Sequence, residues 1–303
     1  MLGKSFGQNA YWQQKVDYTI NVKLNDVEHT LDGFIKINYR NNSPDTLKYI
    51  WFHLWPNAYK NDRTAFSEQM LENGNTSFYF SKQEERGYIN QLDFRVNDVH
   101  AETEDHPSDI DIVKLNLPAP LQPGQTILIT TPFHVKLPYI FSRSGYVGES
   151  FQVTQWYPKP AVYDSIGWHP MPYLDQGEFY SEFGSFDVSI TVPQNYVIAA
   201  TGVLQNEPEK EWIRSRSSFS FKETKLRKKA KRGSYKIIRQ LYPLTSSETK
   251  TLQYKQDNIH DFAWFADKRF VVKEDTCRLS SGRVVQVSSF FTNKSQQVWN
   301  IPP

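Results

Sequence analysis

This sequence has very little cysteine and no long apolar run. Cys277 is the only cysteine among 303 residues, which excludes a disulfide framework and a zinc site made of several thiolates. No apolar run approaches the roughly 18 residues that a membrane-spanning helix needs, so no membrane span is predicted. Residues 1–5 also lack the apolar segment of a secretory signal. The compartment stays open between the cytosol and export, for example to the periplasm, with a signal removed before this numbering begins.

Several catalytic motifs are also missing. No two of the seven histidines lie four residues apart, so the zinc-binding pattern His-Glu-x-x-His is absent. The sequence has neither the Gly-x-Ser-x-Gly pattern of a serine nucleophile nor a glycine-rich phosphate loop. We therefore predict no catalytic residue, no metal ligand and no cofactor within this chain.

Positive and negative charges nearly balance along the chain, except in one segment. The net charge is only +2, but lysines and arginines dominate residues 222–232, where Glu223 is the only opposing carboxylate. No recognition helix or stacking motif accompanies this run, so no nucleic-acid partner is predicted. We interpret the run as an exposed loop, a chain boundary or an insertion.

What the sequence does contain is aromatic residues and strand-like alternation. Aromatic residues make up 15% of the chain, and apolar residues recur at every second position in several segments. The fold class predicted from this pattern is mainly β, as an antiparallel β-sandwich or a saddle-shaped curved sheet. Strands are expected over 16–24, 31–39, 47–55, 110–117, 126–137 and 186–192, and a short helix over 65–71.

Three segments are distinctive enough to compare with known families. Trp, Tyr, Pro and Gly are concentrated in the first, and such stiff residues favour a fixed local shape. The three read Gln155-Trp156-Tyr157-Pro158-Lys159-Pro160, then Asn258-Ile259-His260-Asp261-Phe262-Ala263-Trp264-Phe265-Ala266-Asp267, and, earlier in the chain, Trp51-Phe52-His53-Leu54-Trp55-Pro56-Asn57-Ala58-Tyr59. Together with residues 186–193 they resemble the N-terminal β-domain of the zinc aminopeptidase family that includes aminopeptidase N and leukotriene hydrolase.

The resemblance covers roughly residues 10–295 and implies a division of the chain. Residues 1–275 are expected to form the β-domain, with the basic run as a loop or insertion near 222–232. Residues 276–303 are expected to begin a metallopeptidase catalytic domain that is absent here, since the chain ends before any His-Glu-x-x-His. The resemblance further implies zinc in the full-length parent, and its partners would be a peptide substrate and the missing catalytic domain.

The resemblance also suggests substrate-binding residues. The family places a Gln, and two residues later a Gln or Glu, beside the free amine of the peptide. These positions are Gln155 and Tyr157 here, so the second departs from the family's pattern. Glu178 is a candidate for the missing carboxylate, and Glu182 is a weaker one. The predicted function is thus the N-terminal part of a zinc aminopeptidase, which walls the substrate cleft and helps to hold the amine, and is inactive alone.

An alternative from another functional class stays open at this point. The chain could be a non-catalytic β-sandwich binding module that uses exposed Trp156, Tyr157 and Trp168 as a platform for sugar or peptide. The two hypotheses differ in what they require of these rings, because a platform must be accessible to solvent.

Overall fold

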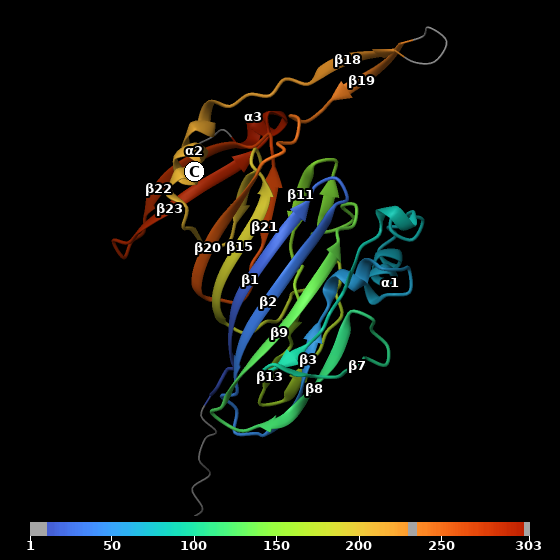
Figure 1. Ribbon diagram of the computed structural model, residues 1–303, viewed down its shortest axis with the longest axis vertical. Coiled ribbons are helices and arrows are strands. Elements are labelled where there is room, and N and C mark those ends of the chain that lie inside the picture. The colour runs from blue at the N-terminus through green and yellow to red at the C-terminus, as the bar shows by residue number, and fades with distance from the viewer. Residues whose placement is uncertain (1–10, 230–234, 300–303) are drawn as a thin grey trace, which may run out of the picture.

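The computed structural model describes residues 11–229 and 235–299, and its main feature is a long, curved sheet of nine strands (Figure 1). The strands follow one another in the order β17 (Val203–Leu204), β20 (Thr249–Ile259), β15 (Gly184–Pro193), β1 (Lys15–Asn25), β2 (Thr30–Arg40), β9 (Thr126–Lys136), β5 (Arg95–Val96) and β6 (Val99–His100), while β4 (Tyr88–Asn90) also pairs with β9. Every pairing is antiparallel except that of β1 with β15, which is parallel. The predicted mainly β, antiparallel and curved architecture is confirmed.

Alternating burial explains why these segments form strands of one sheet. In β1 the side chains of Val16, Tyr18, Ile20, Val22 and Leu24 are buried, while most of those between them are exposed. A strand places successive side chains on opposite faces, so this pattern turns one face toward a core. Each large apolar side chain buried there contributes about 1.5–3 kcal/mol. The expected strands over 16–24, 31–39, 126–137 and 186–192 are confirmed to within two residues at each end.

Two four-stranded sheets share the core of the large sheet. One has the order β12 (Lys159–Pro160), β3 (Leu47–His53), β8 (Ile112–Leu121) and β7 (Thr103–Asp105), and the other β10 (Gly145–Val147), β11 (Ser150–Val153), β21 (Trp264–Asp267) and β16 (Val197–Ala200). A single cluster of buried apolar residues includes Ile37 of β2, Phe52 of β3 and Trp264 of β21. The layers are therefore held together by one continuous core.

Two expected strands have different ends in the structure. The strand expected over 47–55 stops at His53, and a 3-10 turn, η1 (Trp55–Tyr59), follows it. Pro56 explains the early end, because it has no backbone N–H for the ladder and its φ suits the first turn of a helix. The strand expected over 110–117 is β8, which begins at Ile112 and continues to Leu121. The short helix is confirmed as α1 (Ala65–Glu72), whose N-cap Thr64 accepts a hydrogen bond from the backbone N–H of Ser67.

The remaining elements are short helices and three hairpins. The helical segments are η2 (Gln83–Glu85), α2 (Glu207–Ser215), η3 (Arg216–Ser218), η5 (Asn293–Ser295) and α3 (Gln296–Trp299), and the hairpins are β13 (Val162–Asp164) with β14 (Gly167–His169), β18 (Thr224–Lys229) with β19 (Tyr235–Gln240), and β22 (Val271–Arg278) with β23 (Val284–Phe291). None of the helices among the described residues is long and apolar enough to cross a membrane.

The basic run is a strand where a loop was expected. Residues 224–229 form β18 and pair in antiparallel register with β19, which places Leu226 opposite Ile238. The strand-forming residues of β19 give the run a partner that its own composition does not reveal. The hairpin projects from the body of the molecule (Figure 1). Lys231 and Arg232 lie outside the described residues, so the interpretation of the run extends only to residue 229.

The expected domain boundary after residue 275 falls inside a strand. β22 runs without a break from Val271 to Arg278 and pairs along its whole length with β23. Its first two residues are buried, whereas residues 274–278 are exposed. The division into 1–275 and 276–303 stays a prediction, and residues 1–10 and 300–303 of these two parts are outside the described chain.

Candidate functional site

The segment from Gln155 to Pro158 joins β11 to β12 and is anchored in the interior. Trp156 is fully buried, and its indole Nε1 donates a hydrogen bond of 3.0 Å to the carbonyl oxygen of Phe262. Its ring also lies edge-on to Trp264, with 6.2 Å between the ring centroids. Tyr157 is 1% exposed. These contacts fix the segment against β21 and the residues before it.

Burial of these rings contradicts the alternative of an aromatic binding platform. A platform needs accessible faces, but Trp156 and Tyr157 lie inside the core, and Trp168 is half-buried against it. The expectation that Trp156 and Tyr157 are exposed is therefore wrong. The physical reason is that burying a large aromatic side chain in a sheet core is favourable in free energy, and the exposed rings of a platform would forgo that gain.

Gln155 occupies an unusual backbone conformation. Its φ is +52°, in the left-handed region that non-glycine residues seldom adopt. Such a conformation costs of order 1 kcal/mol and persists only where surrounding contacts hold it. The side chain of Gln155 is half-buried and forms a hydrogen bond with Asp261, and the residue lies outside the regular strands.

Gln155, Tyr157 and Lys159 converge on one carboxylate, that of Asp261. The amide Nε2 of Gln155 donates to Asp261 Oδ2 at 2.5 Å, and the hydroxyl of Tyr157 donates to Asp261 Oδ1 at 2.9 Å. Lys159 Nζ lies 2.7 Å from the same Oδ1. We call these four residues the Gln155 cluster. Their side chains come from two segments about a hundred residues apart, so the fold alone brings them together.

The Gln155 cluster contains a buried ion pair. The Lys159 side chain is 1% exposed and the Asp261 side chain 22%. Burial lowers the pKa of Lys159, although the attraction of Asp261 acts in the opposite direction. Burial also acts to raise the pKa of Asp261, but the charge of Lys159 and the hydrogen bonds it receives outweigh this and lower that pKa. Burial and the nearby Asp261 raise the pKa of Tyr157, so its hydroxyl remains a donor.

The side-chain amide oxygen of Gln155, Oε1, has the weakest hydrogen bonding of the polar atoms in the cluster. Among the described residues it accepts one hydrogen bond, from Lys159 Nζ at 3.5 Å, and the same ammonium also lies 3.4 Å from Ser181 Oγ. Because a carboxylate only accepts hydrogen bonds, Asp261 must face the NH₂ of Gln155. The amide is thereby oriented with its oxygen on the side away from Asp261.

The structure separates one predicted site residue from the other two. Gln155 and Tyr157 meet at Asp261, whereas Glu178 is exposed on the loop before β15 and has no hydrogen bond or ion pair with the cluster. Glu182, the weaker candidate, is buried elsewhere on the same loop and lies 3.4 Å from the backbone nitrogen of Tyr163. Lys159 and Asp261 were missed, although both belong to segments that the sequence singled out. The opposite charges of these two residues were the only sequence feature that could have suggested an ion pair between them.

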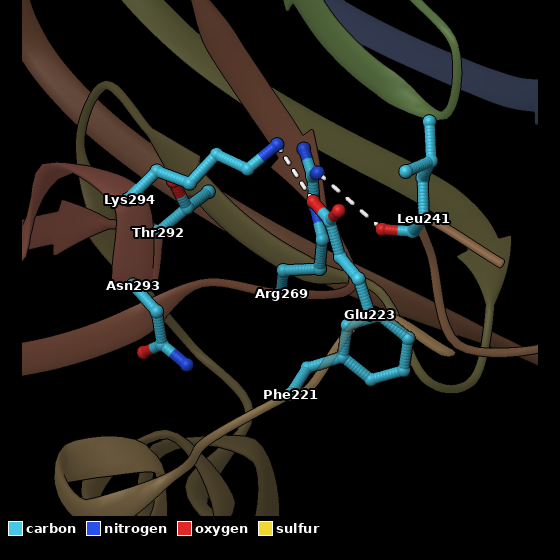
Figure 2. Close-up of a pocket in the computed structure, with 7 residues that line it drawn as sticks. All are labelled: Phe221, Glu223, Leu241, Arg269, Thr292, Asn293 and Lys294. Atoms are coloured by element: carbon cyan, nitrogen blue, oxygen red, sulfur yellow. Dashed lines mark hydrogen bonds and ion pairs between the residues drawn. The ribbon is translucent and has the colours of Figure 1, made fainter. Parts of the chain in front are cut away.

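A different pocket, of about 220 Å³, lies beside the end of β23 and is lined by charged groups that already have partners (Figure 2). Lys294 Nζ lies 2.6 Å from Glu223 Oε1. Arg269 is paired with Asp267 and also points toward the carbonyl oxygen of Leu241, as Figure 2 shows. These satisfied pairs leave no charged group of the pocket free for a ligand.

A metal centre needs several ligand side chains gathered at one place. Within residues 11–229 and 235–299, no three or more His, Cys, Asp and Glu side chains lie close enough together to hold a metal ion. A zinc site needs at least three such ligands. These residues therefore do not fit a zinc ion.

No protein-family model matches this chain, and no curated protein sequence matches it. Its fold is similar to the crystal structure of a mutant M1 zinc metallopeptidase from Deinococcus radiodurans, with a TM-score of 0.50 and 13% identity, over 93% of this chain and 48% of that chain. Another structure of an M1 zinc metallopeptidase from Deinococcus radiodurans gives a TM-score of 0.48 and 14% identity, over 95% of this chain and 50% of that one. A structure of a two-domain M1 zinc metallopeptidase mutant bound to L-arginine gives 0.49 and 12%, over 93% and 48%. At these identities the likeness is one of fold, and this chain spans about half the length of each solved chain.

Proposed function

We propose that this chain is the β-domain of a zinc aminopeptidase and that it walls one side of the substrate cleft. The observation that carries the proposal is the fold, which matches an M1 zinc metallopeptidase over 93% of this chain but only 48% of the other. The resemblance of the three distinctive sequence segments to the zinc aminopeptidase family supports the same proposal. The partners of the domain are then a peptide substrate and a catalytic domain.

In this proposal the side-chain oxygen Oε1 of Gln155 accepts a hydrogen bond from the free amine of the peptide. A peptide ammonium needs acceptors held at a fixed position, because preorganised hydrogen bonds to a charge are the strong ones. The bond from Gln155 Nε2 to Asp261, together with the strained backbone at φ +52°, would keep the amide from turning. Lys159 does not oppose the ammonium strongly, since its own charge is neutralised by Asp261 at 2.7 Å.

Tyr157 then has a positioning role rather than a direct one. Its hydroxyl is directed at Asp261, and its ring is buried, so it supports the carboxylate that orients Gln155. Glu178 has no contact that supports a part in amine binding. The carboxylate that the family's pattern places near the amine would instead be Asp261, whose side chain is 22% exposed.

Zinc in such an enzyme would be held by residues other than those described. When bound, zinc lowers the pKa of its water and polarises the scissile carbonyl. The contribution of this domain is limited to binding and orienting the amine end of the substrate. Aminoacyl substrates with a blocked amine would therefore lose most of their binding to it.

The test is kinetic and uses the protein that carries this domain together with its metal-binding part. Gln155→Ala is expected to lower kcat/KM for an aminoacyl-anilide by about 5- to 150-fold, the equivalent of 1–3 kcal/mol for a lost hydrogen bond to a charge. Gln152→Ala, an exposed residue of the neighbouring strand β11, is the matched control and should leave kcat/KM unchanged. Absence of zinc-dependent peptidase activity would overturn the enzyme assignment. Unchanged kinetics in Gln155→Ala would overturn only the role of Gln155.

A further inference from the structure

A second pocket, of about 300 Å³, is lined by none of the residues of the Gln155 cluster. Three stretches that are distant in sequence form it: residues 11–13 before β1, residues 162–165 of the β13–β14 hairpin, and the segment with Tyr180 and Glu182 before β15. The pocket combines aromatic walls with two carboxyl groups. We call it the Glu182 pocket.

Aromatic rings make up much of its wall. Trp12 and Tyr163 are neighbours, with 5.7 Å between their ring centroids, and Tyr163 is backed in turn by Trp168 at 4.9 Å. Tyr11 and Tyr180 also line the pocket, and both are exposed. The faces of such rings carry negative potential and attract organic cations, most strongly when the cation is shielded from water.

Glu182 is the buried carboxyl group of the pocket. Its side chain is only 3% exposed, and Oε1 lies 3.4 Å from the backbone nitrogen of Tyr163. Where the structure describes side chains, no Lys, Arg or His lies within ion-pair distance of it. Burial raises the pKa of Glu182 to about 7, against the lowering effect of backbone hydrogen bonds, and the charge of Asp164 adds to the rise. An ionised carboxylate at this depth has an unmet need for a positive partner.

Asp164 lines the same pocket but already has partners. Its Oδ1 lies 2.8 Å from His169 Nε2 and accepts a hydrogen bond from the backbone N–H of Ile166. Its Oδ2 receives the hydroxyl of Tyr180 at 3.4 Å. Asp164 therefore adds negative potential, while Glu182 is the carboxyl group left to meet a ligand.

We propose that the Glu182 pocket binds an organic cation of the alkylammonium class, with Glu182 as the counter-charge and Trp12, Tyr163 and Tyr180 as the aromatic faces. A metal ion fits less well, because hard cations require six or more oxygen ligands and the walls are mainly rings. A neutral apolar ligand would leave Glu182 without a partner. The inference does not depend on the proposed peptidase function, since none of its residues belongs to the Gln155 cluster.

The test compares choline with its neutral carbon analogue, 3,3-dimethyl-1-butanol, by isothermal titration calorimetry at constant ionic strength. Saturable binding of choline in the millimolar range is expected, with the neutral analogue at least tenfold weaker. Glu182→Gln keeps the size of the side chain and should weaken choline binding at least fivefold, as should Trp12→Leu. Glu72→Gln, an exposed carboxyl group on α1, is the matched control and should bind choline as the unaltered protein does. Circular dichroism of each variant checks its fold.

The pH dependence gives a second readout. Besides Asp164, the titratable groups whose charge reaches Glu182 are Tyr180 of its own segment, Tyr18 of β1 and Tyr39 of β2, all three with a raised pKa. Choline affinity should therefore fall as the pH drops below 7 and Glu182 takes up a proton, until it approaches the affinity of Glu182→Gln, and Glu182→Gln should abolish this dependence. Equal binding of the two ligands, no saturable choline binding, or unchanged binding in Glu182→Gln would each overturn the proposal.

Discussion

The ion pair between Lys159 and Asp261 should make a large and asymmetric contribution to stability. Asp261→Ala leaves the Lys159 ammonium, which is 1% exposed, with two long hydrogen bonds, to Gln155 Oε1 at 3.5 Å and Ser181 Oγ at 3.4 Å. Its other neighbours are the rings of Trp55 and Tyr157, whose centroids lie 5.2 and 5.1 Å away. Removing one partner of a buried pair costs about 3–5 kcal/mol. The 22% exposure of the Asp261 side chain admits some water, so we expect the lower end, about 3 kcal/mol.

The reverse substitution should cost less. Lys159→Met leaves Asp261 with donors from Gln155, Tyr157 and the backbone of Phe262, and the carboxylate is partly hydrated. A loss of about 1–2 kcal/mol is therefore expected. In the double variant, which combines Lys159→Met with Asp261→Ala, no unpaired charge remains. The two losses should then fall short of additivity by about 1–2 kcal/mol.

The assay is urea-induced unfolding, followed by both tryptophan fluorescence and far-UV circular dichroism so that a single transition can be verified. Lys255→Met is the matched control, because Lys255 pairs with Asp187 at 3.0 Å but with side chains 50% and 34% exposed. It should change stability by less than about 1 kcal/mol. A loss below 1 kcal/mol for Asp261→Ala, or additive losses in the double variant, would refute the reasoning.

Two further predictions concern the core. Burial raises the pKa of Asp111 to about 7 from 3.8, so the folded protein keeps a proton between about pH 4 and 7 that the unfolded chain has lost, and stability falls as pH rises through that range. Asp111→Asn should remove this fall, so the variant should keep up to about 4 kcal/mol of unfolding free energy that the unaltered protein loses between pH 4 and pH 8. Parallel pH profiles of the unfolding free energy in the two proteins would contradict this. Gly33→Ala would place a Cβ 2.2 Å from Phe133 Cζ and should cost about 1–3 kcal/mol in urea unfolding; a change below 0.5 kcal/mol would contradict the tight packing.

The strands of the central sheet were predictable because one physical rule decides them. β1, β2 and β9 each bury every second side chain for most of their length, and that alternation is visible in the sequence. Helix α2 was not predicted, since among its residues only Glu209 and Ile213 are buried. Its apolar side consists of little more than Trp212 and Ile213, so the helix depends on its contacts with the rest of the fold.

The candidate site was predictable only in part. The sequence pointed to Gln155 and to the segment around Asp261, yet it could not show that a carboxylate more than a hundred residues away accepts the amide hydrogen bond. Long-range polar pairs leave no periodic pattern. The fixed local shape around Trp156 was expected from the sequence. In the structure it results from burial of the ring in the core, which the sequence did not indicate.

The parallel pairing of β1 with β15 has a consequence for synthesis on the ribosome. β1 is made well before its neighbour on one side, β15, which begins only at Gly184, and β15 in turn needs β20, which ends at Ile259. A nascent chain can pair β1 with β2 as soon as both are made, while the other edge of β1 stays open until β15 follows. Contacts this distant in sequence fold slowly, and an open strand edge invites association with other chains. Chains released before residue 259 should therefore aggregate, and the protein should depend on chaperones that shield β1 until β15 and β20 arrive.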